Sequence, residues 1–324
     1  MWAEPLVPVP GAASGCVLSL DVGGTKIAAA LVGLDGTLLR VVRAPTPVGA
    51  GADRMFELVA VLLRDVAGYS APLGIGVGCG GPMQWPSGVV SPLNIPDWRD
   101  FPLREALAAL YPGIPVRVHN DAVCLVAAEH WLGAGAGLRD VLGMVVSTGV
   151  GGGLVLDGRL VTGATGNAGH IGHVVVDPDG PACACGGRGC LEAVASGPSA
   201  VRWALEQGWV PPAGMVATGQ AVAEAARVGD PVAAQTLRRA GAALGVALAS
   251  AVHLTDVSVV SIGGGFATGA GPLLMDPLAE AYAHHAGLGF ARRPRVVPAA
   301  LGPQAGLVGA AALVLRGDTY WTGD

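Results

Sequence analysis

One histidine and three cysteines lie close together in the chain and could bind a metal ion. His173, Cys183, Cys185 and Cys190 have the spacing H-x9-C-x-C-x4-C, and three glycines let the chain bend between the last two cysteines. Three thiolates and one imidazole form a recognised tetrahedral ligand set for structural zinc, and such soft ligands favour zinc over magnesium or calcium. The spacing therefore predicts a structural zinc site.

Two other interpretations of these cysteines stay open. They could be buried free thiols beside a surface histidine, or two of them could form a disulfide. The disulfide is disfavoured because three local thiols leave one over, and because nothing marks the chain as secreted. Cys16, Cys79 and Cys124 are scattered along the chain, and we expect them to be small, buried apolar residues.

Two glycine-rich segments follow short apolar runs and could hold phosphate groups. Residues 21–26 read DVGGTK and residues 147–153 read STGVGGG. Backbone N–H groups, hydroxyls and an ammonium group in such loops can bind phosphate oxygens. Each loop is predicted to join two strands, which indicates an internal duplication and excludes a Rossmann or Walker-A loop, where a helix must follow. For the first loop, a plain hairpin turn is an equally good interpretation.

The Asn120-Asp121 pair stands between a predicted strand over 116–119 and a predicted helix over 122–132. Asparagine and aspartate are favoured N-caps, so the pair could simply start the helix. The carboxyl end of a strand is also where α/β proteins place ligands, and a carboxylate there can act as a general base. Both interpretations stay open on the residues alone.

Hydrophobic periodicity predicts both strands and helices along the chain. The expected strands cover 17–22, 27–32, 38–43, 73–77, 116–119, 141–146, 154–156, 257–262 and 296–298. The expected helices cover 54–66, 103–110, 122–132, 199–207, 219–227, 231–252, 272–284 and 304–315.

The composition excludes several classes of protein. With 324 residues, 52% hydrophobic and 13% charged, the chain can bury a large core and is not a disordered protein. A net charge of −5 gives no basic surface for nucleic acid. The mean hydropathy is +0.54, but the longest uncharged stretches are too short or too rich in glycine to span a membrane. The start of the chain has no basic segment typical of a signal peptide, so we expect a cytoplasmic protein.

Taken together, the two glycine-rich hairpins, the Asn-Asp pair and the GH-x9-C-x-C-G-x-x-G-C-x-E run resemble the ROK family of sugar kinases and repressors. The resemblance covers about residues 17–315. It implies an α/β, two-domain actin-like ATPase fold (ribonuclease H-like, duplicated) with an interdomain cleft. The expected parts are a loose tail at 1–15, a small α/β domain at 16–119, a large α/β domain with the zinc loop at 120–303, and a C-terminal helix at 304–324 that packs back on the small domain.

The resemblance also implies a function and a site. The expected reaction is ATP-dependent phosphorylation of the primary hydroxyl of a hexose or N-acetylhexosamine, with Asp121 as the catalytic base, Mg²⁺ held by Asp21 through water, and a structural Zn²⁺. A homodimer or a higher homo-oligomer is expected, with no nucleic-acid or membrane partner. The implied sugar-binding residues are Gly81, Asn94, Asn120, Asp121, His170, His173 and Glu192. The implied ATP-binding residues are Asp21, Gly23, Gly24, Thr25, Lys26, Thr148, Gly149, Gly151, Gly264 and Gly265.

The chain departs from the family pattern at two places. Family repressors carry a winged helix before the first glycine loop, and only 20 residues precede Asp21, so we do not expect a DNA-binding repressor. Most family kinases read AGEIGH where this chain reads AGHIGH, which places His170 at the position of a sugar-binding glutamate. Bacterial N-acetylmannosamine kinases are similar to the chain at this position.

The histidine bears on the choice of sugar. A carboxylate accepts hydrogen bonds from two vicinal hydroxyls, whereas a neutral imidazole can donate an N–H to the carbonyl of a 2-acetamido group. His170 thus favours N-acetylmannosamine over glucose, unless it points elsewhere and the chain is a plain glucokinase. A kinase for a sugar-like cyclitol and a non-catalytic sugar sensor are the other candidates, and the presence of Asp21, Lys26 and Asp121 favours an enzyme over the sensor.

Overall fold

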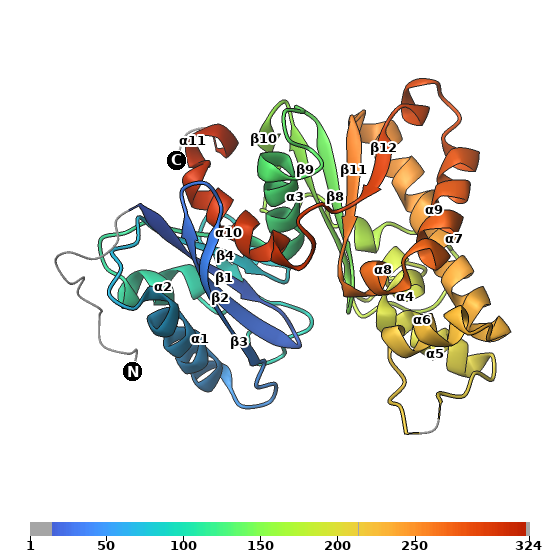
Figure 1. Cartoon of the computed structure of the whole chain (residues 1–324), viewed down its shortest axis with the longest axis horizontal. Coiled ribbons are helices and arrows are strands. Elements are labelled where there is room, and N and C mark those ends of the chain that lie inside the picture. The colour runs from blue at the N-terminus through green and yellow to red at the C-terminus, as the bar shows by residue number, and fades with distance from the viewer. Residues whose placement is uncertain (1–14, 213, 322–324) are drawn as a thin grey trace. The chain divides into compact units, whose positions relative to one another are not determined.

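The computed structural model describes residues 15–212 and 214–321, so the expected tail at 1–15 lies, except for Gly15, outside the described residues. The chain forms two compact units (Figure 1). Of the described residues, 15–139, 153–169 and 304–321 form the first unit, and 140–152, 170–212 and 214–303 form the second. The division therefore falls at Asp140 and not at the expected Asn120, because the helix after Asn120 packs on the first unit's sheet: a Cβ atom on Gly78 would lie 3.0 Å from Cys124 Sγ.

The first unit is built on a five-stranded sheet with the order β3-β2-β1-β4-β7. The first three strands form the expected antiparallel meander, and β4 and β7 pair with β1 and β4 in parallel. Its elements are β1 (Cys16–Val22), β2 (Lys26–Gly33), β3 (Leu38–Pro45), α1 (Ala52–Ala67), β4 (Ile75–Cys79), β5 (Met83–Gln84), β6 (Val89–Val90), α2 (Leu103–Leu110), β7 (Val116–Asn120), α3 (Asp121–Leu132), β10 (Arg159–Leu160), α10 (Ala305–Leu315) and α11 (Gly317–Tyr320).

Both faces of this sheet are covered, which explains why its central strands are apolar throughout. Leu18 and Leu20 of β1 belong to the same core as α1, whereas Val17 belongs to a second core with Leu307 of α10 (Figure 1). Neighbouring residues of a strand point to opposite faces, so one strand serves both cores. The Ser19 hydroxyl donates to the carbonyl of Leu307, which fixes α10 on the sheet.

The second unit contains the parallel strands β8, β11 and β12, which belong to a sheet of order β10-β9-β8-β11-β12, together with a group of helices. The residues of β9 fall in both units. The remaining elements are β8 (Val141–Val146), β9 (Val150–Leu156), α4 (Leu191–Ala195), α5 (Gly197–Glu206), α6 (Gly219–Arg227), α7 (Pro231–Thr255), β11 (Val259–Gly263), α8 (Gly265–Ala270), α9 (Pro272–His285) and β12 (Arg295–Pro298), with short 3-10 turns at Ile171–His173, Phe290–Arg292 and Gly302–Gln304.

The longest helix, α7, shows how sequence signals set an element's bounds. The Asp230 side chain accepts from the Ala233 N–H and Pro231 follows at the first helical position, both favoured at helix starts. Gly241 and Gly245 allow close packing against α9, because a Cβ atom on either would lie 2.5 Å from a carbonyl oxygen of that helix. Among the described helices, α7 included, none is long and apolar enough to cross a membrane.

The prediction of a loop over 147–153 is wrong for its second half, 150–153. Strand β9 begins at Val150, so Gly151, Gly152 and Gly153 are strand residues. Gly153 has a packing role there, since a Cβ atom on it would lie 2.8 Å from Val123 Cα in α3. The short helices α4 and α8 were not expected either, because five or six residues are too few to show a helical period.

Candidate active site

The first unit brings the expected acidic residues to the carboxyl ends of its parallel strands. In the parallel register, Asp21 of β1 pairs with Gly78 of β4, and Gly78 pairs with His119 of β7. Neighbouring strands lie about 5 Å apart, so the backbone at Asp21 and at His119 is separated by about 10 Å. Asn120 and Asp121 follow at once, which places both carboxylates at the carboxyl ends of parallel strands, where open α/β sheets bind ligands.

The two carboxylates influence each other. Burial, followed by the charge of Asp121, raises the pKa of Asp21 to about 7, although Lys26 and Arg43 act in the opposite direction. The helix α10 contributes to this burial, because a Cβ atom on Gly306 would lie 2.8 Å from Asp21 Oδ2. Two acidic groups in such an environment are stabilised by a cation, which lowers their pKa values.

The Asn120-Asp121 pair starts α3, as one interpretation of the sequence predicted. Asn120 is the N-cap, and its Oδ1 accepts from the Ala122 N–H at 2.9 Å. Asp121 is the first helical residue, and its Oδ1 accepts from the same N–H at 2.7 Å. The N-cap interpretation of Asn120 is confirmed. The bond from the Ala122 N–H involves only Oδ1 of Asp121, so a role of this carboxylate as a base is compatible with the cap.

The first glycine loop is a tight turn between β1 and β2. The Gly23 N–H donates to the Lys26 carbonyl at 3.0 Å, and the Thr46 hydroxyl donates to the Gly23 carbonyl at 2.6 Å. Thr25 and Lys26 are exposed. A Cβ atom on Gly24 would lie 2.8 Å from Asn94 Cβ, so the glycine allows the segment that carries Asn94 to lie against the turn.

The second unit holds the second glycine loop as a turn between β8 and β9. The Ser147 N–H donates to the Gly149 carbonyl at 2.8 Å, and the Gly197 N–H at the start of α5 donates to the Ser147 carbonyl at 2.9 Å. Glu192 fixes the next residue, because its Oε2 accepts from the Val150 N–H at 2.8 Å. The expected sugar-binding glutamate thus also joins α4 to the end of this turn.

Residues 263–265, which include the expected ATP-binding residues Gly264 and Gly265, form the junction between β11 and α8. Gly264 has a φ of 101°, a value that residues with a Cβ atom rarely adopt. A Cβ atom on it would lie 2.4 Å from the carbonyl oxygen of Val146 at the end of β8. Glycine at 264 is therefore required for backbone geometry, and it brings the start of α8 next to the end of β8.

The predicted zinc ligands meet in space. One ligand atom from each of His173, Cys183, Cys185 and Cys190 lies within 4.8 Å of all the others. The Sγ atoms of Cys185 and Cys190 are 3.7 Å apart, and Cys183 Sγ is 3.8 Å from His173 Nδ1. Zinc–sulfur bonds of about 2.3 Å in a tetrahedron require sulfur atoms about 3.8 Å apart, so the four residues fit the metal.

The thiols of the cluster differ in how readily they ionise, and burial raises the pKa of Cys183. All six cysteines are free, so the disulfide alternative is wrong. The Gly187 N–H lowers the pKa of Cys185, which favours the thiolate that a metal requires, whereas burial raises the pKa of Cys190 to about 12. Outside the cluster, Cys16, Cys79 and Cys124 are buried, as expected, and burial raises their pKa values.

His170 lies beside the cluster. Its ring and that of His173 are 6.2 Å apart and inclined by 22°, and its carbonyl accepts from the His173 N–H at 3.0 Å. His170 is the N-cap of the 3-10 turn Ile171–His173, and His173 is the last residue of that turn. Gly172 in this turn is so close to β9 that a Cβ atom would lie 1.9 Å from the Val150 carbonyl oxygen. The turn that carries both histidines is therefore fixed by packing and by the cysteine loop.

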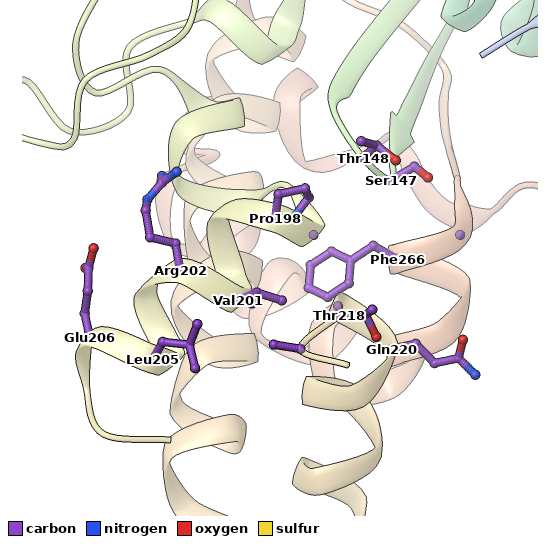
Figure 2. A pocket seen from close by; sticks show the side chains of 14 residues that line it. Ser147, Thr148, Pro198, Val201, Arg202, Leu205, Glu206, Thr218, Gln220 and Phe266 are labelled. Atoms are coloured by element: carbon purple, nitrogen blue, oxygen red, sulfur yellow. The ribbon is translucent and has the colours of Figure 1, made fainter. Parts of the chain in front are cut away.

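The second unit also contains a cavity of about 720 Å³, which is within the size range of cofactor pockets (Figure 2). Its walls come from the turn after β8, from one side of α5 along its whole length, and from the first turns of α6 and α8. Phe266 presents its ring to the cavity in Figure 2, and glycines at the starts of α5 and α6 pack on this side chain. The lining residues are Ser147, Thr148, Gly197, Pro198, Val201, Arg202, Leu205, Glu206, Ala217, Thr218, Gly219, Gln220, Gly265 and Phe266.

The expected site residues divide between the two units. Those in the first unit are Asp21, Gly23, Gly24, Thr25, Lys26, Gly81, Asn94, Asn120 and Asp121, and the others lie in the second. Only Thr148 and Gly265 of the expected ATP-binding residues line the cavity. The contribution of α5 and α6 to the cavity was not predicted. The N-caps Ser196 and Thr218 mark where these helices begin, but nothing in their sequence indicates a shared cavity.

The chain is similar in sequence to two kinds of sugar kinase. The chain is 36% identical to a glucokinase of Thermotoga maritima over 92% of this chain and 96% of that protein. It is 35% identical to an N-acetylmannosamine kinase of Escherichia fergusonii, over 84% and 95% of the two chains.

A crystal structure of a ROK family glucokinase from Streptomyces griseus, in complex with glucose and AMPPNP, superimposes with a TM-score of 0.83 at 34% identity, covering 93% of this chain and 100% of that one. The expected α/β actin-like ATPase fold is confirmed by this similarity. A model of the ROK family matches residues 17–317. The chain therefore belongs to the ROK family.

Proposed function

We propose that the protein is an ATP-dependent kinase for the primary hydroxyl of a hexose or an N-acetylhexosamine. The observation that carries the proposal is the pair of carboxylates, Asp21 and Asp121, at the carboxyl edge of the first sheet beside an exposed lysine-bearing turn. The family membership and the relatives that are named glucokinase and N-acetylmannosamine kinase support it. A panel of hexoses, N-acetylhexosamines and cyclitols with ATP and Mg²⁺, read by ADP release, tests it.

In the proposed reaction, Asp121 accepts the proton of the sugar hydroxyl as the oxygen attacks the γ-phosphorus of ATP. A new bond joins the sugar oxygen to phosphorus, the bond to the β-phosphate oxygen breaks, and ADP leaves. Such transfer depends on positioning and on charge stabilisation. The Ala122 N–H at the start of α3 donates to Oδ1 of Asn120 and to Oδ1 of Asp121, which orients the Asp121 carboxylate. Asn94 and Gly81 are proposed to contact the sugar.

Asp21 and the turn that follows it are proposed to act on the phosphate end of ATP. Magnesium, held by Asp21 through water, would neutralise phosphate charge when bound. The raised pKa of Asp21, about 7, fits such a role, because a buried carboxylate beside a second one gains most from a nearby cation. Lys26 and the Thr25 hydroxyl, both exposed on the turn, are proposed to bind phosphate oxygens.

The cavity beside Phe266 is the proposed site for the adenine and ribose of ATP. Its walls are largely apolar and include an aromatic ring, which suits a planar base, and the turn at Ser147 and Thr148 forms one end of it. The N-termini of α5 and α6 also contribute partial positive charge toward the same cavity. The proposed nucleotide site of this unit is thus formed by the turn after β8, by α5, and by the starts of α6 and α8.

Filling this cavity should weaken ATP binding alone. Val201→Trp places a bulky ring among the lining residues, and we expect the KM for ATP to rise about tenfold, equivalent to about 1.4 kcal/mol, with the KM for sugar little changed. Val210→Trp is the matched control, because Val210 is 78% exposed and outside the cavity. Equal KM values for ATP in the two variants would place the base elsewhere.

The zinc ion is proposed to be structural. The four residues would supply every ligand that a tetrahedral zinc ion takes, so no position would be open for a substrate or a reactive water. Its role would be to hold the loop that carries His170 and His173 so that their side chains meet the sugar in fixed positions. Glu192, two residues after Cys190 and bonded to Val150, would be held in the same way.

His170 is proposed to contact the C2 group of the sugar. A neutral imidazole can donate to the carbonyl of a 2-acetamido group, so we propose N-acetylmannosamine as the preferred class of substrate, with glucose as the alternative. His170→Glu should move the ratio of kcat/KM values toward glucose by about tenfold, since one buried polar contact contributes about 1–3 kcal/mol. His285→Glu, an exposed position at the end of α9, is the control. An unchanged ratio in His170→Glu would mean that this side chain does not contact the sugar's C2 group.

A further inference from the structure

Three aromatic rings gather at the end of the strand that leads to Asp121. The ring centroids of Trp85 and Trp321 are 4.8 Å apart, those of Trp85 and His119 5.4 Å, and those of His119 and Trp321 5.9 Å. These distances are in the range of attractive ring contacts. The rings of His119 and Trp321 are inclined by only 7°, so they stack, and His119 has an exposed fraction of 0%.

The orientation of the His119 ring affects the neighbouring Asn120 and Asp121 directly. Its Nδ1 accepts from the Asn120 N–H at 2.8 Å. Asn120 in turn caps α3, and Asp121 is the next residue. Rotation of the imidazole would remove the acceptor from the Asn120 N–H, and a buried N–H without an acceptor costs about 1–3 kcal/mol. The stacked ring therefore supports the backbone at the base of the proposed reaction.

Trp321 is held in place by hydrogen bonds to α10 and α11 and not by β7. Its indole N–H donates to the Leu313 carbonyl of α10 at 3.1 Å, and its backbone N–H donates to the Gly317 carbonyl at 2.9 Å. Trp85 is anchored separately, because its backbone N–H donates to the Thr165 carbonyl at 3.1 Å. The C-terminal segment thus places one defined ring face on His119.

We propose that Trp321 is a positioning residue for phosphoryl transfer. By stacking on His119 it keeps Nδ1 of that ring facing the Asn120 N–H, and so fixes the position of Asp121 at the start of α3. The inference rests on the proposed role of Asp121 as the base. Trp321 has no contact with substrate in this proposal, and it acts only through His119.

The test compares a variant that keeps an aromatic face with one that keeps only apolar bulk. Trp321→Leu should lower kcat about tenfold, since small displacements of a reacting group have large kinetic effects, with the KM for ATP unchanged. Trp321→Phe should keep kcat within about twofold of the wild type, because a ring face remains. Equal kcat values for the leucine and phenylalanine variants would overturn the proposal, because simple packing does not distinguish them.

Trp131→Leu is the matched control. Trp131 lies on the last turn of α3, about 15 Å along the helix from Asp121, and a Cβ atom on Gly36 would lie 3.2 Å from its ring. We expect wild-type kcat for this variant. A loss equal to that of Trp321→Leu would show that removal of any such tryptophan lowers activity, and would overturn the specific role of Trp321.

Amide hydrogen exchange separates this inference from the proposed function. The Asn120 N–H should exchange faster in Trp321→Leu than in the wild type or in Trp131→Leu, whatever reaction the protein catalyses. Unchanged exchange at Asn120 would overturn the inference even if Asp121 proves to be the base. If instead Asp121→Asn retains full turnover, the role of Asp121 fails, and the exchange result still decides whether Trp321 fixes the end of β7.

Discussion

Replacing Asp121 with asparagine should lower kcat by about a hundredfold or more, which is the usual contribution of a general base. Asparagine has nearly the same shape, and its Oδ1 can still accept from the Ala122 N–H that Asp121 now binds. It cannot accept the proton of a sugar hydroxyl. We therefore expect sugar binding, measured by calorimetry, to be largely retained while turnover is lost.

Asp53→Asn is the matched control for this variant. Asp53 also lies in the first turn of a helix of the same unit, α1, and it is exposed. The change of charge is identical, so wild-type turnover in Asp53→Asn would assign the loss in Asp121→Asn to the position of the carboxylate. Near-normal turnover in Asp121→Asn would exclude Asp121 as the base.

Loss of the zinc site should have the second large effect. Elemental analysis of the wild type is expected to find about one zinc per chain, and Cys185→Ser should reduce this to near zero, because a closed structural site needs all four ligands. We expect kcat/KM for the sugar to fall about tenfold or more, as disturbed metal sites typically do, because the loop with His170 and His173 loses its anchor. Thermal unfolding should also occur at a lower temperature.

Cys16→Ser distinguishes loss of the metal from loss of any thiol. Cys16 is buried in the core of the first unit and far in sequence from the cluster, so this variant should retain the full zinc content even if its stability falls. A wild-type protein that is free of metal and yet fully active would contradict the structural zinc site. Equal zinc contents in Cys185→Ser and the wild type would contradict the ligand assignment.

Short-range patterns in the sequence predicted most of the positions at which chemistry is proposed. The strand over 116–119 and the helix over 122–132 are β7 and α3 to within one residue, because the apolar run and the Asn-Asp cap give independent signals for the same boundary. The cysteine cluster was predictable for a similar reason. Its ligands lie within 18 residues of one another and need only local turns to meet.

The glycines were harder to interpret, because glycine serves loops and close packing alike. Gly151, Gly152 and Gly153 were expected in a loop, but β9 runs through them, and Gly153 lets α3 approach the strand. Gly76 has a similar role in β4, where a Cβ atom would lie 1.7 Å from the Ala310 carbonyl oxygen of α10. The partner in each case is distant in sequence, so no local pattern distinguishes such a glycine from one in a turn.

Features that depend on distant segments were not predictable. The sequence placed a boundary at Asn120, whereas the structure assigns α3 to the first unit through its packing on β4 and α10. The cavity in the second unit combines the turn after β8 with the starts of α5 and α6, which lie 50 and 70 residues further along the chain. The stacking of Trp321 on His119 joins residues that lie far apart in the sequence.

The most direct test of the proposed reaction is to identify its product. The protein is incubated with ATP, Mg²⁺ and the sugar that gives the fastest ADP release, and the mixture is examined by ³¹P NMR. We predict one new phosphomonoester signal, coupled to the protons of the primary carbon of the sugar, in equal amount to the ADP formed and absent with Asp121→Asn. Sugar binding by calorimetry without any phosphorylated sugar would contradict the kinase and identify the protein as a non-catalytic sugar-binding member of its family.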